Sequence, residues 1–463
     1  MTPQDDIIAA IATPIGEGGI SVLRVSGKGS IELCDKKFRK GGTLASAPSH
    51  TAHFGEFTGA KGEVIDEVVA TVFKAPKSYT GEDTVEVSCH GGMFLTRKIL
   101  ESILRSGARS AEPGEFTKRA YLNGRIDLSQ AEAIADLIKA RSEDSLRVSL
   151  LQLQGRLSGK IGELREKLLR LCGLIELELD FAEEGIEIAD KSSINNELTG
   201  IIEELLALID SYEYGKLYRE GVKVVLTGRP NVGKSSILNA LLSEERAIVT
   251  EIPGTTRDVI HESFNIGGLL FNLTDTAGLR ESDNEVERQG ILRTHRELGQ
   301  ADIVAFVVEA GNISEAEWAL INMLRDEASK SRRIILVINK IDLRPGWKLE
   351  LPKCRIGMPV SYMSAKSMEG LDTFREQMAV TATQGNGSNP EKSLIVTNER
   401  QRDSFVRAVA HLHQAQKDLA EGKSNELIAV SVRLAVDNLG EIIGSVATDD
   451  VLNTIFSSFC IGK

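Results

Sequence analysis

The segment at residues 228–235, Gly-Arg-Pro-Asn-Val-Gly-Lys-Ser, constrains the fold of this 463-residue chain more than any other feature. It fits the pattern Gly-x-x-x-x-Gly-Lys-Ser, in which backbone N–H groups surround phosphates, the lysine neutralises their charge and the serine hydroxyl binds Mg²⁺. An apolar run at 222–226 predicts a strand before it, and residues 236–242 predict a helix whose N-terminal dipole faces the phosphates. Because glycine-rich turns between a strand and a helix also occur for structural reasons, further motifs are needed to identify a nucleotide.

Two motifs further along the chain fit a guanine nucleotide. Asp275-Thr276-Ala277-Gly278 follows an apolar run at 269–273, and it supplies a carboxylate for Mg²⁺ and a glycine N–H for a γ-phosphate. Asn339-Lys340-Ile341-Asp342 ends another apolar run, 334–338. The Asp342 carboxylate can accept the N1–H and 2-amino donors of guanine, which adenine lacks, so this motif favours GTP over ATP.

Two shorter motifs complete the set. Ser364-Ala365-Lys366 follows an apolar run at 360–363, and we expect it to close over the base. Gly254-Thr255-Thr256-Arg257-Asp258 lies between the phosphate loop and Asp275, where a switch loop should place a threonine hydroxyl on Mg²⁺. Five motifs in this order, each in its strand context, predict a Ras-like P-loop GTPase domain.

The position after the Asp275–Gly278 motif is unusual. Small GTPases orient the attacking water with a glutamine there, but Leu279 can neither donate nor accept a hydrogen bond. Glu285 and Glu287 follow in a charged segment and could hold the water, although such a run is more often a solvated helix start. A monovalent cation is one alternative source of positive charge for hydrolysis. The arginine candidates for the same role are Arg257, Arg280 and Arg288.

Asn231, inside the phosphate loop, is a second unusual residue. Its side-chain carbonyl could bind K⁺ together with backbone carbonyls of residues 250–255, and the ion would stabilise charge that develops at the β–γ bridge. The alternative is that Asn231 only occupies a left-handed turn, which asparagine tolerates better than most residues.

Length and composition narrow the class of protein. The length suggests roughly three domains. A net charge of −12 and a pI near 5.3 argue against a broadly basic nucleic-acid-binding surface, though not against a local basic patch. The five cysteines form no Cys-x-x-Cys pair and are odd in number, which argues against a zinc knuckle or a disulfide framework. With no run of 18 apolar residues and no basic leader, the chain is predicted to be cytosolic, without a membrane span.

Residues 1–120 predict an α+β N-terminal domain. Its strands are expected at 20–25, 51–57, 64–73 and 84–89, and its helix at 92–105. The loops at 78–83 and 90–92 are rich in functional groups, although turns with satisfied polar groups are the simpler interpretation.

From residue 127 the pattern becomes helical. Ser129-Gln130-Ala131-Glu132 fits a capping box, and helical spacing continues with few breaks to about residue 181. Further helices are predicted at 195–214, 398–421, 425–443 and 449–456. We therefore predict a GTPase domain at 216–382 inserted into a helical domain made of 121–215 and 383–463. The last residues, 459–463, are expected to fray as chain ends do.

Taken together, these residues resemble the MnmE/TrmE family of tRNA-modification GTPases. Segments along nearly the whole chain carry the resemblance: residues 78–83, 90–92, 121–128, the phosphate loop with Asn231, 254–258, 275–280 and the terminal Phe459-Cys460-Ile461-Gly462-Lys463. Cys460 corresponds to the C-terminal cysteine of the family, where a catalytic thiol and a structural role are both open.

The resemblance implies a fold and a set of partners. Family members are cytosolic homodimers through N-terminal domains that are similar to tetrahydrofolate-binding domains and bind 5-formyl-tetrahydrofolate. The implied folate contacts are Arg24, Glu82, Arg125 and Lys463, with Arg125 at a position where the family often has lysine. Members act with a FAD-binding partner, MnmG/GidA. Together they install an aminomethyl or carboxymethylaminomethyl group on C5 of the wobble uridine of certain tRNAs, and folate supplies the one-carbon unit.

The resemblance also implies roles in GTP hydrolysis. Ser235 and Thr256 would bind Mg²⁺; Asn231, Thr250, Ile252 and Thr255 would bind K⁺. Glu287 would organise the water, so the implied catalytic set is Glu287, Lys234, Asn231 and Thr256. The implied GTP-binding residues are Asn231, Val232, Gly233, Lys234, Ser235, Ser236, Thr250, Glu251, Ile252, Pro253, Gly254, Thr255, Thr256, Asp275, Thr276, Ala277, Gly278, Asn339, Lys340, Asp342, Ser364, Ala365 and Lys366.

The competing hypothesis is a regulatory GTPase of the ribosome-assembly kind, which catalyses only its own hydrolysis. Such proteins share the asparagine in the phosphate loop and the apolar residue after Gly278. Against this hypothesis, the sequence contains no recognisable KH-type Gly-x-x-Gly loop in a basic context, and the N-terminal domain would have no role.

Overall fold

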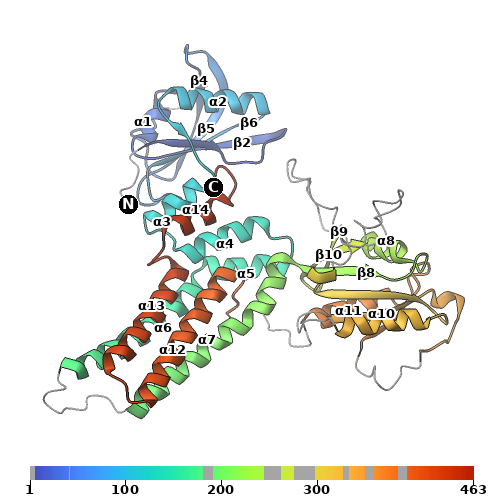
Figure 1. The fold of residues 1–463 in the computed structure, drawn as a ribbon. Helices are drawn as coiled ribbons and strands as arrows, with labels where there is room; N and C mark the ends of the chain where they lie inside the picture. Colours follow the sequence, from blue (N-terminus) through green and yellow to red (C-terminus); the bar gives the residue numbers. More distant parts are fainter. Residues whose placement is uncertain are drawn as a thin grey trace, which may run out of the picture. The chain divides into compact units, whose positions relative to one another are not determined.

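The computed structural model describes residues 6–40, 42–180, 191–244, 262–275, 298–326, 333–349, 358–383 and 394–463. They form two compact units (Figure 1). The first combines Met1–Ala135, Gln152–Thr199 and Arg407–Lys463, and the second combines Asp136–Leu151 and Gly200–Val406.

The N-terminal part of the first unit is a seven-stranded sheet in the order β3-β4-β5-β6-β2-β1-β7, antiparallel except for the parallel pair β1 and β7. The strands are β1 (Ile8–Ile11), β2 (Gly18–Ser26), β3 (Phe38–Arg39), β4 (Thr51–Thr58), β5 (Val64–Phe73), β6 (Thr84–Gly91) and β7 (Arg109–Ser110). Alternate residues of β5, namely Val68, Ala70 and Val72, are buried in a core that α2 (Met93–Arg105) and α1 (Ser30–Asp35) complete. This strand pattern confirms the predicted α+β domain.

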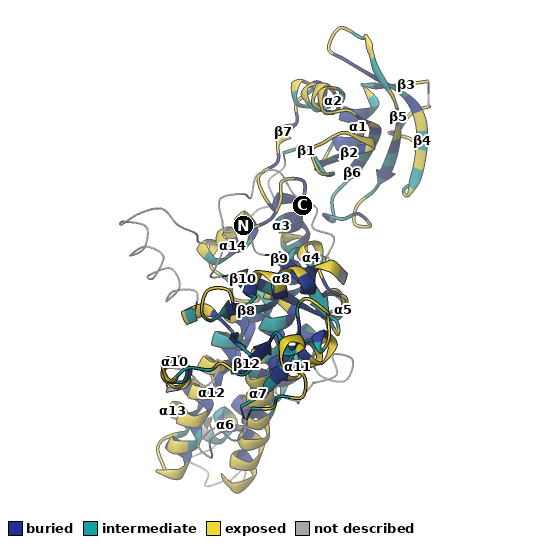
Figure 2. Ribbon diagram, turned by 90° about the vertical axis from the view of Figure 1, so that its right-hand side faces the viewer, coloured by how far each residue is buried: buried dark blue, intermediate teal, exposed yellow. Residues whose placement is uncertain are grey.

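The opposite face of this sheet carries apolar side chains in solvent. Phe54 and Val69 are cross-strand partners on β4 and β5, and Ile20 lies on β2. Their exposed fractions are 65%, 37% and 70%, respectively. The ribbon of β4 includes exposed stretches (Figure 2). A sheet face of this kind is typical of a surface that is covered in an assembly.

Helices make up the rest of the first unit. They are α3 (Glu115–Leu122), α6 (Arg156–Asp180), α13 (Asn425–Ile443) and α14 (Asp449–Ser457), with parts of α4 (Leu128–Lys139), α7 (Lys191–Glu220) and α12 (Glu399–Ala420). Helices α6 and α13 pack side by side, and Arg433 of α13 forms an ion pair with Glu176 of α6 at 2.5 Å.

Two helical predictions were wrong in detail. The helical stretch expected from 127 to about 181 is divided into α4, α5 (Glu143–Leu153) and α6, and Gly155 at the second break has a φ of 79°. The capping box begins at Asp127 rather than at Ser129. Asp127 Oδ1 accepts the Gln130 N–H at 2.9 Å, and Gln130 Oε1 accepts the Asp127 N–H at 3.0 Å. Aspartate serves this role as well as serine does, and it lies where the helix actually begins.

The second unit contains a six-stranded sheet in the order β13-β12-β11-β8-β10-β9. The strands are β8 (Val222–Thr227), β9 (Glu262–Ile266), β10 (Leu269–Asp275), β11 (Ile303–Glu309), β12 (Arg333–Asn339) and β13 (Val360–Tyr362), all parallel except for β9. The first strand, β8, lies between β11 and β10, so the chain crosses over in both directions from it. Ligands of such sheets bind at the carboxyl ends of the strands where the order reverses, which here is the end of β8.

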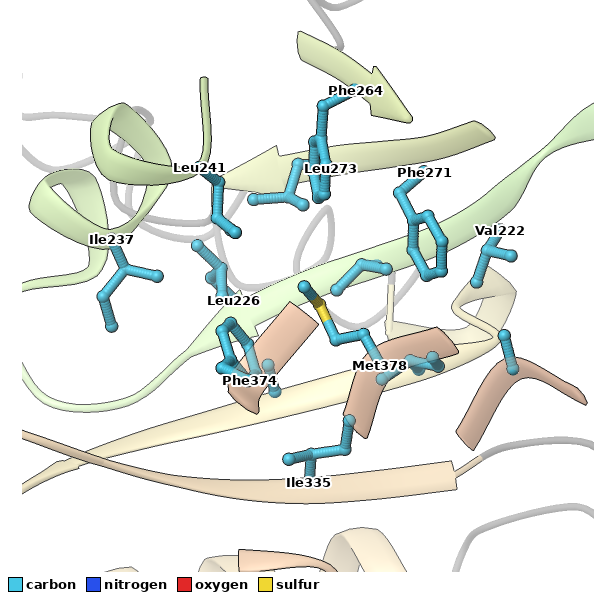
Figure 3. Close-up of a cluster of buried hydrophobic side chains, with 14 of the residues drawn as sticks. Val222, Leu226, Ile237, Leu241, Phe264, Phe271, Leu273, Ile335, Phe374 and Met378 are labelled. Carbon is cyan, nitrogen blue, oxygen red and sulfur yellow. The ribbon is translucent and has the colours of Figure 1, made fainter. Parts of the chain in front are cut away.

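Apolar layers cover both faces of this sheet. On one face, α8 (Lys234–Glu244) and α11 (Leu371–Thr383) enclose Leu226, Phe271 and Met378, and the rings of Phe264 and Phe271 stack at 5.7 Å (Figure 3). On the other face, α10 (Glu315–Asp326) packs over β11 and β12. Helix α5 also belongs to this unit, because Val148 packs into the first of these layers. The strands of the GTPase domain lie between α7 and α12 in the chain, as the predicted insertion requires; the exact domain boundaries stay predictions.

Candidate functional site

The loop that joins β8 to α8 has three residues in the left-handed region. They are Gly228, Asn231 and Gly233, with φ values of 143°, 63° and 99°. A Cβ at Gly228 would lie 2.2 Å from the carbonyl oxygen of Val307, so only glycine fits there. The sequence therefore specifies a tight loop that leads into the first turn of α8, where Ser235 and Ser236 lie. The free N–H groups of a helix N-terminus favour anions such as phosphates.

Lys234 is buried, with 7% of its surface exposed. Its Nζ donates to the carbonyl oxygens of Gly228 and Arg229 at 2.9 and 2.8 Å. The ammonium group is thereby held against the loop, where phosphates would be enclosed.

Asn339 connects three of the predicted motifs. Its Nδ2 donates to the Val232 carbonyl at 2.8 Å, and its Oδ1 accepts the Ala365 N–H at 3.0 Å. With 2% of its surface exposed, Asn339 holds both contacts away from water. The structure thus brings together the phosphate loop, the base-recognition motif and the Ser364–Lys366 motif, which are far apart in the sequence.

The residues around Asn339 lie at the edge where the guanine base is expected to bind. Lys340 has a φ of 63° and forms an ion pair with Glu309 at 3.1 Å. Asp342 lies exposed in a short 3-10 helix, Ile341–Leu343, and Lys366 is also exposed. Ser364 is buried, and its hydroxyl accepts the Ser367 N–H at 3.2 Å.

Several predicted residues lie outside the described part of the chain. Asp275 is the last residue of β10 and pairs in register with Leu226. Asp275 is therefore within the described part. The residues outside it, whose roles stay predictions, are Thr250, Glu251, Ile252, Pro253, Gly254, Thr255, Thr256, Thr276, Ala277, Gly278 and Glu287.

A second cluster, in the first unit, surrounds Arg24. The guanidinium group pairs with Glu86 at 2.8 Å, stacks over the Tyr79 ring at 4.6 Å and donates to the Gly462 carbonyl at 3.4 Å. Lys463 follows directly, and burial together with the charge of Arg24 lowers its pKa. The end of the chain is therefore held in the N-terminal domain, contrary to the expectation that it frays. Gly462 permits this with a φ of 95°, because a Cβ would lie 2.3 Å from the Ile11 carbonyl.

Glu82 lies next to this cluster because it contacts Ser26, which is on the same strand, β2, as Arg24. Glu82 accepts the Ser26 hydroxyl at 3.0 Å and forms an ion pair with Arg119 at 3.3 Å. Arg125 is exposed on the turn after α3, and no contact among the described residues joins it to Arg24. The structure thus brings together Arg24, Glu82 and Lys463 and leaves Arg125 at the surface.

Sequence reasoning missed two members of the cluster, Glu86 and Arg119, and it singled out Tyr79 only as part of the loop at 78–83. Glu86 opposes Arg24 in the antiparallel register of β2 and β6, which only strand pairing reveals. Arg119 is preceded four residues earlier by Glu115, and the two form an ion pair at 3.0 Å. This i, i+4 spacing of opposite charges on a helix could have predicted the ion pair from the sequence.

Comparisons with known proteins cover the whole chain. Residues 7–125 match the family model described as GTP-binding protein TrmE N-terminus, and residues 128–460 match the MnmE helical domain. The tRNA modification GTPase MnmE of Chlorobium chlorochromatii is 44% identical, over 99% of this chain and 98% of that protein. The corresponding protein of Carboxydothermus hydrogenoformans is 42% identical, over 99% and 100%.

The chain belongs to the MnmE family of tRNA modification GTPases. Membership confirms the predicted GTPase and the multidomain P-loop architecture, since the MnmE helical match begins before the GTPase domain and ends after it. The G domain of the T. maritima FeoB iron transporter is 30% identical and covers 35% of this chain and 98% of its own, but its TM-score of 0.26 supports no structural comparison. No helix in the described ranges is long and apolar enough to cross a membrane.

Proposed function

We propose that this MnmE-family GTPase acts with a FAD-binding partner to add an aminomethyl or carboxymethylaminomethyl group to C5 of the wobble uridine of certain tRNAs. A folate supplies the one-carbon unit, and potassium-activated GTP hydrolysis is coupled to dimerisation of the GTPase domains. One observation supports the proposal most: the same chain contains two sites. They are the nucleotide loops joined by Asn339 and the cationic cluster at Arg24 and Lys463.

GTP binding rests on the loops that the sheet presents. Lys234 lies against the phosphate loop, and Ser235 opens α8 where a hydroxyl can meet Mg²⁺. Thr256 is the second proposed Mg²⁺ ligand. Asp342 is exposed at the base edge, where its carboxylate selects guanine.

Potassium is proposed to supply the positive charge for hydrolysis, a role for which Arg257, Arg280 and Arg288 are the arginine alternatives. Asn231 fits this role because it is exposed in the phosphate loop, which leaves its amide oxygen accessible to an ion. Its φ of 63° is what the alternative, a left-handed turn without an ion, also requires. Its amide oxygen and the backbone oxygens of Thr250, Ile252 and Thr255 would hold the ion. A cation there stabilises charge that develops at the β–γ bridge, and Glu287 would orient the attacking water.

The Arg24 cluster has the chemistry that a folate needs. Two cationic groups, Arg24 and Lys463, lie together in a partly buried place, where burial and, after it, the charge of Arg24 lower the pKa of Lys463. A carboxylate of folate would relieve the repulsion. The Glu82 carboxylate suits the N–H donors of a pterin ring.

A homodimer is proposed through the N-terminal domain. The apolar sheet face that carries Ile20, Phe54 and Val69 supports this, because such a face is more stable when covered. The FAD-binding partner and a cytosolic location follow from the family resemblance. A regulatory GTPase is the alternative function; it would leave the Arg24 cluster without a ligand.

Titration of 5-formyl-tetrahydrofolate into the full-length protein tests the folate part of the proposal. We expect saturable binding that Arg24→Met weakens at least roughly tenfold, the size expected when one charged contact is lost. Arg97→Met, which removes an exposed arginine of α2, should bind like the parent protein. The absence of saturable binding in the parent would favour the regulatory alternative.

A further inference from the structure

The first half of the phosphate loop is attached to α10 by Arg229. Its Nε donates to Glu317 Oε1 at 2.6 Å, and its Nη2 donates to the Asn312 carbonyl at 2.8 Å. The guanidinium group therefore spans two acceptors at the start of α10, a geometry that suits its planar fork.

The acceptor on α10 is itself held in place. Only 4% of the Glu317 side chain is exposed, and its second oxygen accepts the backbone N–H and the hydroxyl of Ser314 at 2.8 and 2.9 Å. Ser314 and Glu317 thus form a capping box at the N-terminus of α10. Arg229 is bound to a fixed point rather than to a mobile surface carboxylate.

The second half of the loop has a different anchor, the bond from Asn339 to the Val232 carbonyl. Asn231 lies between the two anchors, exposed and with a φ of 63°. Left-handed backbone is unfavourable for a residue with a Cβ, so this conformation depends on what holds its neighbours. On one side, the Arg229 side chain joins the loop to Glu317, and Lys234 binds the Gly228 and Arg229 carbonyls within the loop itself; on the other side, Asn339 binds the Val232 carbonyl.

We infer that Arg229 is a positioning residue for GTP hydrolysis. By binding Glu317 it fixes the loop segment that carries Asn231, and so it fixes the amide oxygen at the proposed K⁺ position. The inference rests on the potassium role proposed above. Arg229 acts through Asn231, because its Nε and Nη2 are both directed at α10.

Two other roles for Arg229 lead to different results. If Arg229 has a purely structural role, its removal lowers the unfolding temperature, by a small amount because the side chain is partly exposed, and leaves the response to K⁺ unchanged. A direct contact with the phosphates would weaken nucleotide binding itself.

The test measures GTP turnover against K⁺ concentration, together with GDP affinity, in the full-length protein. Arg229→Met should raise the K⁺ concentration for half-maximal turnover by roughly tenfold, since small displacements of positioning groups have effects of that order. GDP affinity should stay within about threefold, because the Gly233–Ser236 amides and Asn339 remain. Arg229→Lys should shift the midpoint in the same direction, because an ammonium group cannot bridge Glu317 and the Asn312 carbonyl in the same way.

Arg219→Met is the matched control, since Arg219 also pairs its Nε with a nearly buried carboxylate, that of Asp136 at 2.9 Å. It should leave the K⁺ midpoint unchanged. Adding Arg229→Met to Glu317→Gln should add little, because both remove one link. An unchanged K⁺ midpoint in Arg229→Met and Arg229→Lys, with the parent still stimulated by K⁺, would overturn the inference alone. A parent protein with equal turnover in K⁺ and Na⁺ would overturn the potassium proposal and this inference with it.

Discussion

Replacing Asn339 by alanine is the most informative single change in the nucleotide site. The substitution removes the donor to the Val232 carbonyl and the acceptor for the Ala365 N–H. Both contacts are intraprotein and buried, so the effect does not depend on where a ligand sits. It separates the phosphate loop from the base-binding loops while leaving every other predicted GTP-binding residue in the chain.

The size of the effect follows from burial. Each hydrogen bond contributes a net ~1 kcal/mol, and a buried partner left unpaired costs ~1–3 kcal/mol more. With 2% of Asn339 exposed, water cannot replace the lost partners. Counting only the two partners left unpaired, the total is about 2–6 kcal/mol, and if the nucleotide has to restore the loop arrangement, GTP affinity falls by at least roughly 30-fold.

Fluorescence titration of a labelled GTP analogue into Asn339→Ala measures this loss. Asn339→Asp should also bind weakly, because it keeps the acceptor for Ala365 but places a second oxygen against the Val232 carbonyl. Asn272→Ala is the matched control. Asn272 donates to the Glu220 carbonyl and accepts the Ser263 hydroxyl, both at 2.9 Å, so its loss should affect stability but leave GTP affinity within about twofold. Parent-like affinity in Asn339→Ala, or an equal loss in the control, would refute the reasoning.

Three further predictions concern other parts of the chain. Glu287→Ala should abolish turnover and leave GTP affinity nearly intact, because the lost contact exists mainly in the transition state; single-turnover kinetics and titration separate the two, and a parallel loss of binding would contradict the assignment. Burial would raise the pKa of Glu115, but hydrogen bonds from Arg109 and neighbouring groups outweigh it and hold the pKa below its ordinary value of 4.5. Glu115→Gln should therefore destabilise the protein above that pH, and the difference in the free energy of unfolding between variant and parent should vanish as the pH falls through the folded pKa. Urea denaturation at several pH values measures this difference. A constant difference down to pH 2 would be inconsistent with this ion pair. Gly114→Ala should lower the unfolding temperature, because its Cβ would lie 2.4 Å from the Phe456 carbonyl at a φ of 69°; an unchanged temperature would contradict that packing.

The sheet of the GTPase domain was predictable from sequence because its strands are short apolar runs between recognisable motifs. The runs at 222–226 and 334–338 are confirmed by β8 and β12 within one residue at each end. The breaks in the long helical stretch were not predicted, because apolar spacing continues across residues 140–142 and 154–155 while the backbone does not. Asp127 was missed as a cap because the expected pattern began with serine.

For the two sites, too, the contacts between residues close in the sequence were predictable and the contacts between distant residues were not. The phosphate loop is a local motif, so its glycines and Lys234 were identifiable. The central role of Asn339 depends on partners in two other loops, and the pairing of Arg24 with Glu86 depends on strand register. Neither contact can be predicted from the spacing of residues along the chain. The docking of Gly462 beside Arg24 joins residues 438 positions apart, which no chain-end rule anticipates.

Reconstitution of the complete reaction tests the central claim most directly. The full-length protein is incubated with the flavoprotein partner, tRNA, a reduced folate and GTP, and the nucleosides of the digested tRNA are analysed by mass spectrometry. We predict an aminomethyl or carboxymethylaminomethyl group on the wobble uridine that requires the chain, the folate and hydrolysable GTP in K⁺. Unmodified wobble uridine under every condition, with GTP turnover intact, would contradict the proposal and favour a regulatory GTPase.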